Sequence, residues 1–313
     1  MLFDKLPLTL YTFNIMKLEY TVNESTRHTN IKQVLKSQFG MSDRLILRLK
    51  KAAQIYCNSN IVNIHSPIHL GDVVSANISF EEECENIVPV KMNLDILYED
   101  EGLLVINKGT NTPVHPSLNH YEDSLSNGVK YYFDSIGLKR KIRPINRLDK
   151  DTSGIVLFAK NEYIQECLVK QMKTNDFEKQ YLALLDGIVT KPLQTVIAHI
   201  ARKTTSIIER CVNNTGDYAE TEIELLDTYS NYSLVKCKLK TGRTHQIRVH
   251  TKHIGNPILG DTLYGNSSSL ISRQALHAYK VKFIHPITKE HLEIICNPPE
   301  DMLKLIDNKT KVH

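Results

Sequence analysis

Two aspartates in the segment RLDKDTSG have the residue type and the setting for catalysis. Asp149 and Asp151 stand directly before a Thr-Ser-Gly turn and the apolar run IVLFA. Such a turn should hold the preceding residues at the end of a buried strand, where a rigid scaffold orients a catalytic side chain. The alternative is an Asx or ST turn, in which both carboxylates only accept hydrogen bonds from backbone N–H groups. The residues alone leave both interpretations open.

A second polar segment, TGRTHQIRVHTKHIGNPILGDTLYG, lies further along the chain. It carries two arginines and three histidines: Arg243, Arg248, His245, His250 and His253. No carboxylate stands where the zinc-protease pattern HExxH requires one, so we expect no metal site. Guanidinium groups bind phosphates and carboxylates well, which makes an anion-binding surface the better interpretation.

An apolar run carries one tyrosine that could contact a base. Tyr181 lies in EKQYLALLDG, where a core tyrosine with a satisfied hydroxyl is the ordinary interpretation. A protein that handles nucleotides would also need an aromatic face on which a base can stack. Both interpretations remain open at this point.

The elements that must position these residues mix strands with helices from residue 93 onward. The runs LDILYE, LLVINK and QYLALLD read as strands separated by turn residues, and EYIQECLVKQMKTN reads as a helix. YSLVKCKLK alternates as a half-buried strand does. We therefore predict an α+β domain with a central mixed, largely antiparallel β-sheet, rather than a doubly wound one.

Positive charge is concentrated in the first quarter of the chain. Residues 1–80 hold nine lysines and arginines and five acidic residues, a difference equal to the +4 of the whole chain. Within them, SDRLILRLKKAAQ predicts an amphipathic helix capped by Ser42. Arg44, Arg48 and Lys51 share one face of this helix. That face would suit an RNA phosphate backbone, although such a row can also be merely solvated.

The order of elements in this region resembles the small RNA-binding module of ribosomal small-subunit protein four. The resemblance rests on SDRLILRLKK, IYCNSN and HLGDVV, while the Gly-Val that usually separates helix and strand is absent. EEECEN followed by Pro89 predicts a linker. We therefore predict a small basic α/β RNA-binding module with a degenerate pattern over residues 1–88, and a catalytic domain over residues 89–313.

The bulk properties predict a cytoplasmic protein without membrane contact. No apolar run approaches the ~20 residues of a membrane-spanning helix, and the start MLFDKLPLTLYTFN lacks a signal-peptide pattern. Scattered cysteines without a close pair indicate reduced thiols. They are Cys57, Cys84, Cys167, Cys211, Cys237 and Cys296.

Five ordered segments between residues 93 and 296 closely resemble the pseudouridine synthases of the RluA type, which modify uridines in ribosomal and transfer RNA. The segments are VINKGTNTPVHPS, NRLDKDTSGIVLFAK, KQYLALLDG, LKTGRTHQIRVHTKHIGNPILGDTLYG and LHAYKVKFIHP. The resemblance implies the fold of these enzymes with its catalytic cleft. It also implies an RNA isomerase that needs no cofactor.

The resemblance further implies roles for single residues. It makes Asp149 the catalytic aspartate, Tyr181 the residue that stacks on the target base, and Arg243 the arginine that pairs with the aspartate. Arg147 would lie near the space left by the flipped-out nucleotide. Asn146 stands where the family most often has histidine, and it can form hydrogen bonds but cannot carry charge.

The remaining expectations concern partners and rival functions. We place further RNA contacts at His245 and Arg248, and we expect Asp151 only to hold the turn after Asp149. The expected enzyme is a monomer without metal, with large-subunit ribosomal RNA favoured as substrate and transfer RNA as the alternative. Whether Asp149 attacks the anomeric carbon or removes a sugar proton stays open. A catalytically silent ribosome-assembly factor and a metal-dependent hydrolase are the rival functions.

Overall fold

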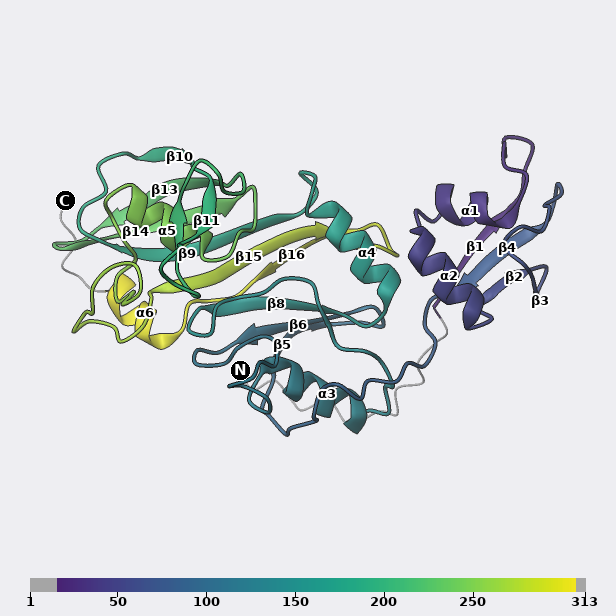
Figure 1. Ribbon diagram of the computed structural model, residues 1–313, viewed down its shortest axis with the longest axis horizontal. Coiled ribbons are helices and arrows are strands. Elements are labelled where there is room, and N and C mark those ends of the chain that lie inside the picture. Colours follow the sequence, from purple (N-terminus) through teal and green to yellow (C-terminus); the bar gives the residue numbers. More distant parts are fainter. Residues whose placement is uncertain (1–15, 308–313) are drawn as a thin grey trace.

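The computed structural model describes residues 16–307, which form a small N-terminal unit and a larger body (Figure 1). The opening segment MLFDKLPLTLYTFN lies outside the described residues. In the N-terminal unit, an antiparallel sheet of order β1-β4-β2-β3 is accompanied by two helices. The elements of this unit are β1 (Lys17–Thr21), α1 (Ile31–Ser37), α2 (Asp43–Lys51), β2 (Ile55–Cys57), β3 (Asn60–Ile61) and β4 (Val73–Asn77).

The amphipathic helix predicted in this unit is confirmed as α2. The side chain of Ser42 accepts the N–H of Leu45 at 3.1 Å and caps the helix, whose apolar face is buried. The strand β3 is short and covers only Asn60–Ile61. The likeness of this unit to a ribosomal RNA-binding module, and the domain boundary at residue 88, stay predictions.

The body is built on a ten-stranded sheet whose main path has the order β10-β13-β14-β9-β15-β8-β6-β5. Its strands are β5 (Asp95–Glu99), β6 (Leu103–Lys108), β7 (Arg143–Pro144), β8 (Ser153–Ala159), β9 (Glu178–Asp186), β10 (Leu193–Ile197), β13 (Glu220–Thr228), β14 (Tyr232–Leu239), β15 (Leu276–Ile284) and β16 (His291–Ile295). Among the described strands of this sheet, only β8 and β15 pair in parallel. The predicted α+β fold with a mixed, largely antiparallel sheet is therefore confirmed.

Four helices and a hairpin complete the body. They are α3 (Leu125–Ser135), α4 (Glu162–Gln171), α5 (Gln246–His253), α6 (Glu300–Ile306) and the hairpin of β11 (Ile200–Arg202) with β12 (Arg210–Val212). The helix predicted from EYIQECLVKQMKTN is confirmed as α4, and it ends earlier than that segment does. Figure 1 shows α3 beside β5, and α4 between the large sheet and the N-terminal unit. Within residues 16–307, no helix is both long and apolar enough to cross a membrane.

One apolar cluster runs from the N-terminal unit into the body. Leu45 and Val74 of the unit belong to the same cluster of buried residues as Val105 of β6 and Leu157 of β8. Burial of apolar side chains is the main stabilising contribution to such packing. The two parts of the chain are therefore joined by more than the linker.

The basic face of α2 meets acidic residues of the body. The Arg48 guanidinium contacts the Glu162 carboxylate at the start of α4 and lies 3.6 Å from Glu82 in the linker. Arg44 lies 3.5 Å from Glu162 but keeps 79% of its side chain exposed, and Lys51 is exposed as well. The charge of Arg48 is thus paired between the two parts of the chain, and the RNA contact expected at this residue stays a prediction.

Candidate active site

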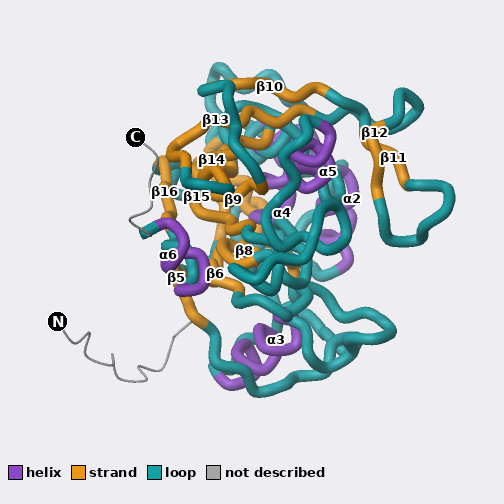
Figure 2. Tube along the Cα trace, turned by 90° about the vertical axis from the view of Figure 1, so that its left-hand side faces the viewer, coloured by secondary structure: helices purple, strands orange, loops and turns teal. Residues whose placement is uncertain are grey.

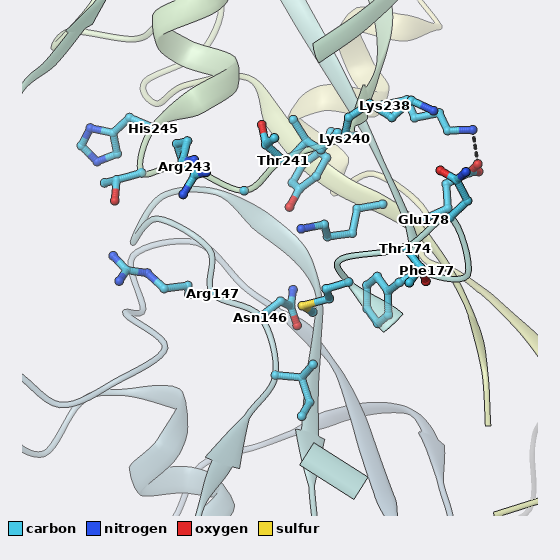
Figure 3. Close-up of a pocket in the computed structure, with 18 of the residues that line it drawn as sticks. Asn146, Arg147, Thr174, Phe177, Glu178, Lys238, Lys240, Thr241, Arg243 and His245 are labelled. Atoms are coloured by element: carbon cyan, nitrogen blue, oxygen red, sulfur yellow. Dashed lines mark ion pairs between the residues drawn. The ribbon is translucent and has the colours of Figure 1, made fainter. Parts of the chain in front are cut away.

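A cavity of about 510 Å³ collects residues from four separate segments of the chain. The segments are the loop before β8, the turn before β9 together with β9 itself, the end of β14, and the loop before α5. Figure 3 shows Arg147 on one side of this cavity, across from Arg243 and His245. The lining includes these predicted site residues: Asn146, Arg147, Asp149, Tyr181, Arg243 and His245.

Asp149 is presented by a turn that packs tightly against β15. The N–H of Thr152 donates to the carbonyl of Asp149 at 3.1 Å and closes the turn. Gly154 follows with φ +111°, and a Cβ there would lie 2.3 Å from the carbonyl oxygen of Ala278. Only glycine fits this approach of β8 to β15. The predicted role of Asp151 in holding the turn stays a prediction.

Lys108 holds the same turn from the opposite side. Its buried ammonium donates to three carbonyl oxygens, those of Gly109, Thr112 and Lys150, at 2.7, 2.9 and 2.9 Å. Burial lowers the pKa of Lys108 to about 7, against the opposing charges of the two nearby aspartates. Reasoning from the sequence missed this residue, although it stands at the end of the strand LLVINK.

Arg248 is the arginine that pairs with Asp149. One guanidinium nitrogen, Nη1, donates to Asp149 Oδ2 at 2.8 Å. The other two nitrogens, Nε and Nη2, donate to the carboxylate of Asp261 at 2.7 and 2.9 Å, and Asp261 is fully buried. Burial lowers the pKa of Arg248, but the two carboxylates outweigh it and hold that pKa above its usual value. The arginine is therefore a fixed cation that orients the carboxylate of Asp149.

The structure pairs these arginines differently from what the resemblance implied. Arg243 was expected to pair with Asp149, but its Nε donates to the carbonyl of Tyr218 at 2.9 Å and its Nη1 lies 3.6 Å from Asp217. Arg248 was expected to contact RNA; its side chain is 8% exposed and lies between two carboxylates, and the RNA contact stays a prediction. Reasoning from the sequence also missed Asp261. The glycine turns that flank it were the available signal.

His245 also faces the catalytic candidate. Its Nε2 lies 3.7 Å from Asp149 Oδ1, and its Nδ1 lies 2.8 Å from the hydroxyl of Tyr264. The backbone of His245 has φ 58°, in the left-handed region that residues other than glycine rarely adopt. Burial lowers the pKa of His245 despite the opposing charge of Asp149. His245, which we expect to contact RNA, thus lies in the wall of the cavity beside the Asp149 carboxylate.

Tyr181 lies in β9, between Cys237 of β14 and Ala278 of β15. Tyr181 is buried, as a core tyrosine is, and it also lines the cavity, as an aromatic surface for a base would. Its position agrees with both interpretations that the sequence left open. Burial and the charge of Asp149 raise the pKa of Tyr181 above its usual value. Its hydroxyl therefore stays protonated at neutral pH, beside the carboxylate.

The two residues before Leu148 have different surroundings. Asn146 donates through Nδ2 to the carbonyl of Ile155 and accepts the N–H of Leu157 through Oδ1, both at 2.9 Å. Its amide thus pairs with the backbone of β8, and the RNA contact expected of this side chain stays a prediction. Arg147 is exposed at the cavity, which leaves its predicted RNA contact possible.

Cations line much of the cavity. Besides the two exposed arginines, Lys179, Lys238 and Lys240 belong to its lining. Lys238 pairs with Glu178, and Lys240 lies 3.4 Å from Glu222. Burial lowers the pKa of Lys179, which stands two residues before the cavity tyrosine on the same strand. A polyanion would meet a favourable potential here.

Comparison with known proteins agrees with this geometry. The family model described as RNA pseudouridylate synthase matches residues 102–253. A Bacillus subtilis protein described as an uncharacterised RNA pseudouridine synthase is 37% identical over 270 residues, which cover 86% of this chain and 95% of that protein. The ribosomal large subunit pseudouridine synthase D of Xylella fastidiosa is 33% identical, over 82% of this chain and 81% of its own length.

A solved structure shows the same likeness in three dimensions. Human RNA pseudouridylate synthase domain containing 1 superposes with a TM-score of 0.58 at 26% identity, covering 71% of this chain and 91% of its own. The matched family region contains Asp149, Tyr181 and Arg248. The first two line the cavity described above, and Arg248 donates to the carboxylate of Asp149.

Proposed function

The chain belongs to the RNA pseudouridylate synthases, and on that premise we propose that it isomerises uridines of structured RNA with Asp149 as its catalytic carboxylate. One observation carries this assignment. Asp149 stands in a cavity with an arginine at 2.8 Å and a protonated tyrosine in the wall. Asp151 lies in the same turn but is absent from the residues that line the cavity.

The chemistry explains the need for an ionised carboxylate. The N1–C1′ bond of uridine breaks and a C5–C1′ bond forms, while C5 loses a proton and N1 gains one. No electrons are transferred to or from another molecule. The carboxylate acts either as nucleophile on C1′ or as the base that removes a sugar proton. Either role requires a charged carboxylate, which the guanidinium of Arg248 holds in place by a hydrogen bond.

The target base must leave its stack to reach this carboxylate. The cavity of about 510 Å³ has room for a flipped nucleotide. Tyr181 offers an aromatic surface for the base, beside the reacting carbon. Arg147 and Arg243 at the opening would bind the phosphates on either side of the flipped nucleotide.

We infer ribosomal RNA of the large subunit as the substrate, with transfer RNA as the alternative. Relatives named for the ribosomal large subunit support this choice, and so does the excess of positive charge in the first quarter of the chain. The proposal includes residues 1–88 as an RNA-binding module and residues 89–313 as the catalytic domain. It also includes a cytoplasmic monomer that acts without metal or cofactor.

The decisive experiment measures tritium release from RNA that carries 5-tritiated uridine. Asp149→Asn should abolish release, because an amide can neither attack C1′ nor remove a sugar proton. Asp151→Asn is the matched control, since it makes the same change two residues away, and it should retain most of the activity. Equal loss in both variants would contradict the assignment of Asp149.

The choice of RNA needs a separate test. Large-subunit ribosomal RNA and transfer RNA should be purified from cells that lack the protein and incubated in parallel with the purified enzyme. Pseudouridine mapping should then show a new site in the ribosomal RNA. A new site found only in the transfer RNA would overturn the inferred substrate and leave the enzyme class intact.

A further inference from the structure

Tyr264 contacts both residues that face Asp149. Its hydroxyl lies 2.8 Å from His245 Nδ1, and the two rings meet edge to face with centroids 5.6 Å apart. The guanidinium carbon of Arg248 stands 4.9 Å from the centre of the tyrosine ring. Tyr264 itself is buried and lies on the far side of these residues from the carboxylate. One side chain thus supports two groups that face Asp149.

The hydroxyl of Tyr264 has a second partner in the neighbouring hairpin. The backbone N–H of Arg210 in β12 donates to it at 2.7 Å. Figure 2 shows the β11–β12 hairpin standing out from the body near α5. Hydrogen bonds therefore connect the backbone of this hairpin to a ring that faces the catalytic carboxylate.

The direction of these hydrogen bonds follows from charge. Burial lowers the pKa of His245, and a neutral imidazole carries one N–H and one lone pair. Nε2 faces a carboxylate oxygen at 3.7 Å, so the proton is favoured there and a lone pair would be repelled. Nδ1 must then accept, which makes the Tyr264 hydroxyl its donor. The N–H of Arg210 donates to the same hydroxyl oxygen.

We propose that Tyr264 is a positioning residue that fixes the tautomer of His245 and aims its Nε2–H at Asp149. The inference rests on the proposed function, because it gives Asp149 the catalytic role. Through the bond from Arg210, the position of the β11–β12 hairpin also bears on the active site. RNA that contacts the hairpin would therefore influence the setting of the carboxylate.

The surroundings of His245 determine how it should titrate. The charged groups that face it are Asp149 before β8, Arg248 in α5, Arg210 in β12 and Asp261 in the turn after α5. A hydroxyl that donates to Nδ1 stabilises the neutral ring and so lowers the pKa of His245. Removing that hydroxyl should raise this pKa, because the carboxylate of Asp149 then favours the imidazolium without opposition from the donor.

The first test needs no variant. Ring ¹⁵N shifts of histidine-labelled protein at pH 7.5 report the tautomer of His245, with the signal identified by its loss in His245→Gln. We expect the Nε2–H form. The Nδ1–H form would overturn the proposal, whether or not the protein shows activity on RNA.

The second test removes only the hydroxyl. In Tyr264→Phe, the pKa of His245 should rise by about one unit, and kcat should fall about tenfold with KM changed less than about twofold. The acid limb of the profile of kcat against pH should move to higher pH by the same unit. The reason is that an imidazolium at His245 pairs with the Asp149 carboxylate and makes it a weaker nucleophile or base. Tyr229→Phe is the matched control, since it removes another buried hydroxyl, one that donates to the carbonyl of Ile306 at 2.6 Å.

A double-mutant cycle tests whether the hydroxyl acts through the histidine. In the His245→Gln background, Tyr264→Phe should lower kcat less than about twofold further. The proposal would be overturned if the losses in kcat of the two single variants multiplied in the double variant. An unchanged pKa of His245 in Tyr264→Phe would overturn it as well. A wild-type protein that is inactive on every RNA would contradict the proposed function instead. The tautomer of His245 would still show whether the Tyr264 hydroxyl donates to Nδ1.

Discussion

Replacing Arg248 by lysine tests which arginine holds the catalytic carboxylate. The guanidinium makes three charge-assisted hydrogen bonds, two to buried Asp261 and one to Asp149. A lysine ammonium is a point charge and cannot reproduce the two parallel bonds to Asp261 while it reaches Asp149. Loss of part of a buried ionic network leaves a carboxylate incompletely paired. We therefore expect the free energy of unfolding to fall by about 2–4 kcal/mol.

The same change should slow the reaction. Without the bond from Arg248 Nη1, the Asp149 carboxylate loses its fixed orientation, and kcat should fall about 100-fold, or ~2.7 kcal/mol. Arg243→Lys is the matched control, because that side chain is 42% exposed and contacts a backbone carbonyl. It should change stability by less than ~0.5 kcal/mol and act mainly on KM for RNA.

Urea unfolding followed by circular dichroism gives the stability of both variants, and single-turnover tritium release gives their rates. The reasoning is refuted if Arg243→Lys loses more kcat than Arg248→Lys. Wild-type stability in Arg248→Lys would also refute it, since the buried network would then contribute nothing.

Three further predictions follow from the packing around the catalytic turn. Gly154→Ala should cost more than ~3 kcal/mol or prevent folding, because its Cβ would meet the Ala278 carbonyl at 2.3 Å; urea unfolding and soluble yield check this. Lys108→Met should cost about 2–4 kcal/mol and lower kcat, since three carbonyl oxygens lose the buried donor that they share; unfolding and tritium release measure both effects. Burial lowers the pKa of His277 to about 4, below the ~6.5 of an unfolded chain. The neutral folded form then stabilises the protein fully above pH ~6.5. About 3 kcal/mol should be lost as the pH falls towards 4, measured by urea unfolding across that range.

Each of these predictions has a result that contradicts it. Wild-type stability in Gly154→Ala would mean that β8 and β15 can separate at this point. Normal kcat in Lys108→Met would show that the turn is held without the ammonium. A His277→Gln variant should have a flatter stability curve between pH 4 and 6.5, and an unchanged slope would assign the acid sensitivity to other groups.

The sequence could indicate Asp149 as the candidate catalytic residue but not its ionic partner. Asp149 and Tyr181 lie in separate segments that each resemble one family pattern, and both line the cavity. Arg243 and Arg248 lie in one segment, so the pattern alone could not separate them. His245, with its left-handed backbone, is the cap residue between them. Arg243 precedes it in the loop, whereas Arg248 follows it among the buried residues of α5. A single residue with positive φ is difficult to predict when it is not glycine.

The basic row on α2 shows a second limit. The periodicity of SDRLILRLKK correctly predicted the helix and its buried face. It could not reveal that Glu162, far away in the sequence, would lie against Arg48. Helical spacing determines which side chains share a face, whereas the partner of that face depends on tertiary packing.

The parallel pairing of β8 with β15 bears on how the enzyme becomes active as it folds. Ser153 and His277, which face each other across this pairing, are 124 residues apart in the sequence. Contacts between such distant residues form slowly, because a long loop must close first. Asp149 comes before this closure and Arg248 falls within the loop, so neither half of the chain holds a complete site. We expect recovery of activity to follow the slowest refolding phase.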